Sequence, residues 1–109
     1  MATIKVYDAD GKEYNLAFTL RTIKYMSNNG FNVEEAKNDS IFGIPRLFAG
    51  AFLVNHRDVK EDKIDEIWAN IEDKEGFSNA LISMFNEPIE KLYSEPEDDS
   101  KKAKWEVVR

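Results

Sequence analysis

The chain has 109 residues, of which 42% are hydrophobic and 33% charged, enough apolar material for one hydrophobic core. It contains no cysteine, which excludes a disulfide scaffold, a thiolate metal site and a thiol nucleophile. Its formal net charge of -6 opposes the phosphate backbone of nucleic acid, and its longest apolar stretch is shorter than the roughly 20 residues of a bilayer span. We therefore expect neither nucleic acid nor a membrane as its partner.

The first part of the chain alternates between apolar and polar residues on both sides of a turn. Residues 3–7 and 13–18 follow a period of two, which predicts an antiparallel hairpin. Asp10-Gly11 predicts its turn, because glycine adopts a positive φ without a Cβ clash. A calcium-binding loop that begins at Asp8 is the alternative, but its glycine and glutamate stand at the wrong positions for an EF-hand.

Two helices are expected after the hairpin. Thr19 is placed to cap a helix that begins near Leu20 and ends at residues 28–30, where Asn-Asn-Gly favours a left-handed terminator. Asn32 is placed to cap a short second helix.

The most apolar part of the chain, residues 41–54, predicts a central helix. Pro45 suits a first helical turn, because it lacks a backbone N–H, and we expect the helix to run from there to His56. Gly50 weakens this helix and predicts the close approach of another element. The apolar side of the helix comprises Ile44, Leu47, Phe48, Ala51 and Phe52, widened by Leu53 and Val54.

Two further helices and a tail are predicted for the rest of the chain. Apolar residues recur at i, i+3, i+4 and i+7 from Ile64 to Ile71, which predicts an amphipathic helix that Gly76 breaks. A final helix is expected over residues 77–92, bent at Pro88. Beyond Tyr93 the chain becomes highly charged, which predicts a mobile linker.

Together, these patterns predict an α+β fold that is mostly α. We expect an N-terminal β-hairpin followed by four or five helices within one domain, residues 1–93. Residues 94–109 are expected to form a flexible charged tail that ends in the segment Trp105–Val108.

Few residues have the types and spacing that catalysis requires. His56 is the single histidine, and its neighbours Arg57 and Asp58 do not by adjacency supply a nucleophile and oxyanion donors. The acidic residues within 61–66 are read as a solvated helix face rather than a metal cage, because they alternate with lysines and apolar residues. We expect no enzymatic activity, no cofactor and no metal.

Surplus hydrophobicity points instead to binding. Three phenylalanines lie between residues 41 and 52, on a chain whose amphipathic helices already offer faces for a small core. A well-filled core is the alternative explanation. The segment Trp105–Val108 allows the same choice: it is either a tethered anchor that docks on an open strand edge or groove, or a frayed terminus.

Four segments in this order resemble those of the tail assembly chaperones of long-tailed bacteriophages that infect Gram-positive bacteria. They are KVYDADGKEYNL (residues 5–16), FTLRTIK (18–24), LFAGAFL (47–53) running into Asn55-His56, and the WEVV ending (105–108). The resemblance implies a mostly helical α+β domain. In the host bacterial cytoplasm it would bind the tape measure protein, keep it soluble, and leave when the tail tube polymerises, so that it is absent from the mature virion.

The resemblance also implies homo-oligomers and adds the tail tube protein as a further partner. For contacts with the client we predict Phe48, Phe52 and Leu53, with Trp105 as a second contact. The alternative function is an acidic regulatory or antitoxin-like protein that masks a partner.

Overall fold

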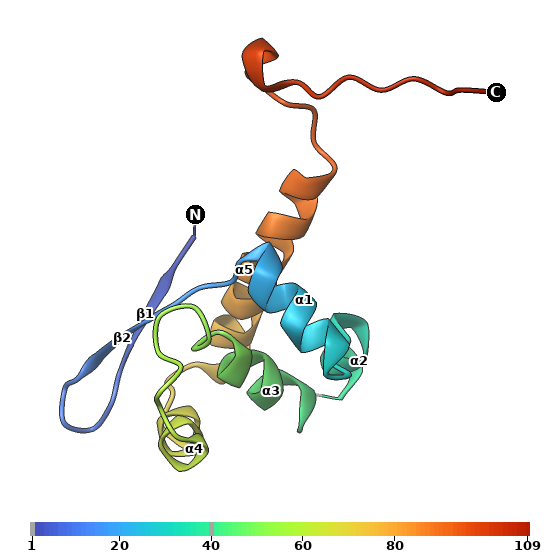
Figure 1. Cartoon of the computed structure of the whole chain (residues 1–109). Helices are drawn as coiled ribbons and strands as arrows, with labels where there is room; N and C mark the ends of the chain where they lie inside the picture. The colour runs from blue at the N-terminus through green and yellow to red at the C-terminus, as the bar shows by residue number, and fades with distance from the viewer. Residues whose placement is uncertain (1, 40) are drawn as a thin grey trace.

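The computed structural model describes residues 2–39 and 41–109, which form a hairpin, five α-helices and an extended tail (Figure 1). The predicted mostly α fold with an N-terminal hairpin is confirmed. None of the helices within these ranges is long and apolar enough to cross a bilayer. In chain order the elements are β1 (Ile4–Tyr7), β2 (Glu13–Leu16), α1 (Leu20–Asn28), α2 (Val33–Asn38), α3 (Gly43–Gly50), α4 (Glu61–Ala69), α5 (Lys74–Leu92) and a short 3₁₀ helix (Asp99–Lys101).

The hairpin has the predicted register and turn. β1 and β2 are antiparallel, with Val6 opposite Tyr14, and both side chains are buried against the core. Gly11 adopts a φ of +82°, and the Asp8 carboxylate accepts hydrogen bonds from two backbone N–H groups of the turn, each at 2.9 Å. Asp8 therefore organises the turn, which favours the turn interpretation over the calcium loop.

The caps of α1 and α2 confirm the expected starts of both helices. The Thr19 hydroxyl accepts a hydrogen bond from the Thr22 N–H, and the Thr22 hydroxyl in turn accepts one from the Thr19 N–H. Gly30 follows α1 with a φ of +89°, as expected for a left-handed terminator. The Asn32 side chain accepts hydrogen bonds from the first turn of α2.

The central helix is shorter than the sequence predicts. α3 ends at Gly50, and residues 51–55 form turns. The physical reason is tertiary: the Ala51 carbonyl accepts a hydrogen bond of 3.1 Å from the Ala17 N–H, just beyond β2. The close approach predicted at Gly50 is confirmed, because a Cβ there would collide with the side chain of Met26 on α1.

Two side chains that follow α3 occupy the outer edge of β2. His56 Nε2 accepts a hydrogen bond of 2.9 Å from the Asn15 N–H, and Asn55 Nδ2 donates one of 3.1 Å to the Asn15 carbonyl. Side chains thus take the place of a third strand along this edge and satisfy both backbone groups of Asn15.

The boundary between α4 and α5 also differs from the prediction. α4 ends at Ala69, and the chain turns through residues 70–73, where Asp73 has a φ of 50°. The Asp73 carboxylate accepts a hydrogen bond of 3.1 Å from the Gly76 N–H and so caps α5. Gly76 therefore lies in the first turn of α5 rather than at the break, and α5 continues through Pro88 to Leu92.

Aromatic side chains from several elements fill the core. The ring of Phe48 on α3 lies 5.1 Å from Phe52, 5.4 Å from Trp68 on α4 and 5.5 Å from Phe77 on α5, measured between centroids. Such tilted and edge-to-face pairs stabilise a core beyond simple area burial. The largest fully buried side chains are those of Leu16, Phe18, Leu47, Phe48, Phe52 and Leu81.

Candidate partner-binding groove

Two of the residues predicted to contact a client lie inside the core. Phe48 is 0% exposed and Phe52 is 1% exposed. The reason is that other elements cover α3 and the turns after it: Trp68 and Phe77 pack on Phe48, and Tyr14 of β2 packs on Phe52. We therefore correct the prediction for these two phenylalanines, which are core residues in this fold rather than exposed client contacts.

The other two predicted residues lie apart from each other. Leu53 is half-buried and lines a shallow hollow of about 220 Å³ beside Tyr25 and Arg46. Trp105 is 84% exposed on the tail, which leaves α5 and extends away from the helices (Figure 1). The structure does not bring Leu53 and Trp105 into one surface.

An apolar groove of about 730 Å³ lies among the helices, and its volume falls within the usual size range of ligand pockets. Three parts of the chain build it: α2 with the start of α3, the end of α4, and the first half of α5. We call it the α3–α5 groove. It is lined by Lys37, Ile41, Ile44, Trp68, Lys74, Glu75, Ser78, Asn79 and Ile82.

Apolar side chains form both the floor and one rim of this groove. Ile44 is buried, and Trp68 and Ile82 are half-buried. On the rim, Ile41 is 74% exposed; the next residue, Phe42, is 70% exposed but lines a separate, smaller hollow. Adjacent large apolar side chains that remain in water are a typical mark of an interaction surface.

The start of α3, one residue after Ile41, departs from ordinary capping chemistry. Phe42 occupies the N-cap position and makes no side-chain hydrogen bond to the helix. Serine, threonine, aspartate or asparagine would stabilise the helix better there, by roughly 1 kcal/mol. A residue that breaks a local rule without stabilising the helix marks a position of functional interest.

The lysines at the groove are already engaged with the framework. Lys74 Nζ donates to the carbonyls of Ala69 at 3.1 Å and Ile71 at 3.2 Å, and it lies 6.0 Å from the Trp68 ring centroid. Lys37 pairs with Glu34 at 3.4 Å. The groove is therefore suited to apolar side chains of a partner more than to a charged ligand.

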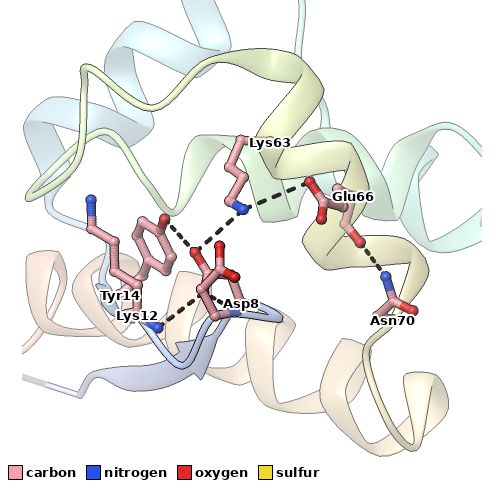
Figure 2. Close-up of polar contacts among 7 residues, drawn as sticks. Asp8, Lys12, Tyr14, Lys63, Glu66 and Asn70 are labelled. Carbon is pink, nitrogen blue, oxygen red and sulfur yellow. Dashed lines mark hydrogen bonds and ion pairs between the residues drawn. The ribbon is translucent and has the colours of Figure 1, made fainter.

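A polar cluster connects the hairpin turn to α4 and is the second candidate site (Figure 2). The Asp8 carboxylate accepts a hydrogen bond of 3.1 Å from the Tyr14 hydroxyl and pairs with Lys63 Nζ at 3.4 Å. Lys63 also pairs with Glu66 at 3.7 Å, and Asn70 Nδ2 donates to the Glu66 carbonyl.

The same contacts shift the pKa values of the cluster. Burial raises the pKa of Asp8, but hydrogen bonds from the Lys12 N–H, the Tyr14 hydroxyl and Lys63 outweigh it, so the Asp8 pKa is lowered. Burial and the hydrogen bond to Asp8 raise the pKa of Tyr14. These groups satisfy one another, so we interpret the cluster as a structural connection between the hairpin and α4.

The remaining polar candidates have structural partners as well. His56 Nε2 already accepts the hydrogen bond from Asn15. Over the described ranges, no group of three or more His, Cys, Asp or Glu side chains is arranged to hold a metal ion.

The residues that line the groove are not evident as one site in the sequence. There, Ile41 belongs to the apolar stretch of residues 41–54, and Trp68 is one position on the apolar face of an amphipathic helix. One signal was present: Ile41 and Phe42 are two large apolar residues placed before the start of the helical stripe, where they have no helical neighbours to pack against.

Comparison with curated proteins finds no match, and comparison with solved structures finds none either. One family model matches almost the whole chain, residues 1–108, and its description assigns no function. The resemblance to tail assembly chaperones therefore stays a prediction. By the match, the chain belongs to the family described as "Domain of unknown function (DUF5055)".

Proposed function

We propose that this protein is a tail assembly chaperone of a long-tailed bacteriophage or prophage. In this proposal it binds the tape measure protein in the host bacterial cytoplasm and keeps it soluble until the tail tube polymerises around it. The observation that supports the proposal most is the open α3–α5 groove, with Ile41 74% exposed at its rim. Homo-oligomers and a contact with the tail tube protein are part of the same proposal.

The groove suits the kind of client that the proposal names. A tape measure chain is long and helical, with an apolar stripe, and a helix of that kind docks through anchors at i, i+3 or i+4, and i+7. The floor residues Ile44, Trp68 and Ile82 offer apolar contacts for such anchors. The net charge of -6 favours solubility of the complex.

The test is copurification of the tape measure protein with wild-type and variant chains. Ile41→Glu introduces a charge at the rim, and because Ile41 is largely exposed, the fold tolerates the change. We expect the affinity for the tape measure protein to fall by about 10-fold or more, as for loss of an interface hot spot. Tyr7→Glu is the matched control, since Tyr7 is 58% exposed and lies outside both the groove and the hollow that holds Leu53.

Two outcomes would contradict the proposal, one for the groove and one for the function. If Ile41→Glu folds as the wild type does and binds the tape measure protein with unchanged affinity, the groove is not the client site. If the wild-type chain neither binds the tape measure protein nor raises its soluble fraction on co-expression, the chaperone function itself is excluded.

An acidic regulatory or antitoxin-like protein that masks a partner is the second candidate. One observation favours it: Glu95, Glu97, Asp98 and Asp99 are exposed together beyond α5. Changing these four to their amides should abolish binding of a basic partner but leave tape measure binding intact. Gene neighbourhood provides a further test, since a chaperone gene is expected between the tail tube and tape measure genes, and a masking protein beside its toxin.

A further inference from the structure

We infer that the C-terminal segment Trp105–Val108, which is extended in this structure, docks reversibly in the α3–α5 groove of its own chain and competes with a client for it. The inference concerns an occupant of the groove that belongs to the protein itself. Docking of the segment does not depend on any client. Its effect on client binding rests on the proposed function.

Two apolar surfaces of the described chain are exposed to water, one at the end of the tail and one in the groove. In the tail, Trp105 is 84% exposed and Val108 is 86% exposed. In the body, the groove is open, with Ile41 exposed at its rim. Bringing an indole ring and aliphatic side chains together removes both surfaces from water, which is favourable.

The length of the linker matches the distance that it must span. The groove residues on α5 run from Lys74 to Ile82, which lie about 15 to 27 Å from Leu92 at a helical rise of about 1.5 Å per residue. A flexible segment as long as residues 93–104 has a root-mean-square end-to-end distance of about 17–21 Å. Effective concentration is highest when these two lengths agree.

One face of α5 leads from the linker to the groove. Ile82, Asn86, Ile89 and Tyr93 follow one another at i, i+4, i+7 and i+11, so they share a face. Ile82 and Ile89 are half-buried, and Tyr93, at the end of the helix, is exposed. A linker that turns back after Tyr93 can follow this partly apolar face to the groove.

The strand edges of the hairpin are poorer docking sites for the tail. Asn55 and His56 already occupy the outer edge of β2. β1 spans only Ile4–Tyr7 and carries Lys5, and short edges with lysine are typical of strands protected against added strands.

Docking within the same chain is also favoured over docking on a second copy. A short tether holds the segment at an effective concentration in the millimolar range, above the concentration of other copies in a dilute solution. The body and tail of one molecule are therefore expected to meet first.

Under the proposed function, the segment is a latch that a client must displace. A client binds only molecules whose groove is open, so its apparent affinity is reduced by the fraction that is open. Trp105→Ala should then bind the tape measure protein several-fold more tightly than the wild type does, whereas weaker binding would support the role of Trp105 as a second client contact and contradict the latch.

The docking itself is tested on the full chain without any client. The chain contains two tryptophans, Trp68 and Trp105, so incorporation of fluorotryptophan gives two ¹⁹F NMR signals, which Trp105→Phe assigns. We expect the Trp105 signal to differ from that of a free peptide of residues 94–109 and to be protected from solvent. Ile41→Glu should return it toward the peptide value, and Tyr7→Glu should leave it unchanged.

Each other result overturns the inference in a distinct way. A Trp105 signal equal to that of the free peptide means that the tail does not dock. A shifted signal that Ile41→Glu leaves unchanged means that it docks elsewhere. A shift that grows with protein concentration, together with a dimeric mass, means that the occupant is a second copy. Circular dichroism of Ile41→Glu confirms that the variant is folded, and tape measure binding is measured separately, so the two proposals fail independently.

Discussion

Replacing Phe48 by alanine tests whether this residue stabilises the core, as the structure indicates, or contacts a client, as the sequence predicted. Phe48 is 0% exposed and packs on three other aromatic rings. Truncating a fully buried phenylalanine costs about 3–5 kcal/mol, because transfer energy is lost and a cavity remains. A domain of this size is stable by only about 5–15 kcal/mol, so a large part of its stability is lost.

The assay is denaturant unfolding followed by the fluorescence of Trp68, whose ring lies 5.4 Å from that of Phe48. The midpoint should fall with little change in slope, because the surface exposed on unfolding stays similar. In a thermal scan the same loss lowers Tm by at least about 10 °C. Phe42→Ala is a matched control: Phe42 is 70% exposed, so its truncation should change stability by no more than about 0.5 kcal/mol.

The reasoning is refuted if Phe48→Ala unfolds at the wild-type midpoint. It is also refuted if Phe42→Ala proves as destabilising as Phe48→Ala, since the burial that distinguishes them would then be wrong. An unchanged midpoint combined with loss of tape measure binding would restore the original prediction of Phe48 as a client contact.

Three further predictions concern single contacts. Because the pKa of Asp8 is lowered from its ordinary value of 3.8, Asp8 stabilises the fold above that pH, and this contribution is lost as the pH falls through the folded pKa. The difference in stability between wild type and Asp8→Asn should therefore be fully present at pH 7 and shrink as the pH falls below 3.8. His56→Ala leaves the Asn15 N–H without its partner, which should cost about 1 kcal/mol and speed hydrogen exchange of that amide. Gly43→Ala should destabilise by about 1–3 kcal/mol in thermal unfolding, because its Cβ would collide with the Ala36 backbone of α2, whereas a helical Gly→Ala change without collision would stabilise.

Structural features that depend only on residues close together in the chain could be predicted from the sequence. The turn at Gly11, the cap at Thr19 and the terminator at Gly30 each depend on a few neighbouring residues, and the structure confirms all three. The amphipathic period of α4 was equally local, since it needs only one apolar face toward any core.

Structural features that depend on contacts between residues far apart in the chain could not be predicted in the same way. The end of α3 at Gly50 depends on a hydrogen bond between Ala51 and Ala17, and nothing near Gly50 in the sequence indicates that partner. Likewise, the α3–α5 groove joins Ile41, Trp68 and Ile82 from three separate parts of the chain. A periodicity read along one helix identifies an apolar face but not the element that covers it.

The exposed apolar surface of this protein is explained better by where its apolar residues lie in the fold than by how many there are. The phenylalanines of the predicted central helix do not supply it, because α4 and α5 cover Phe48 on α3 and the hairpin residue Tyr14 packs on Phe52 just after α3. Among the described residues, the most exposed large apolar side chains lie at Ile41 and Phe42, which precede the helix, and at Tyr93 and in the tail beyond α5. Because these exposed side chains add little to stability, polar substitutions at Ile41 should change binding without changing the fold, and that separation is what makes the groove testable.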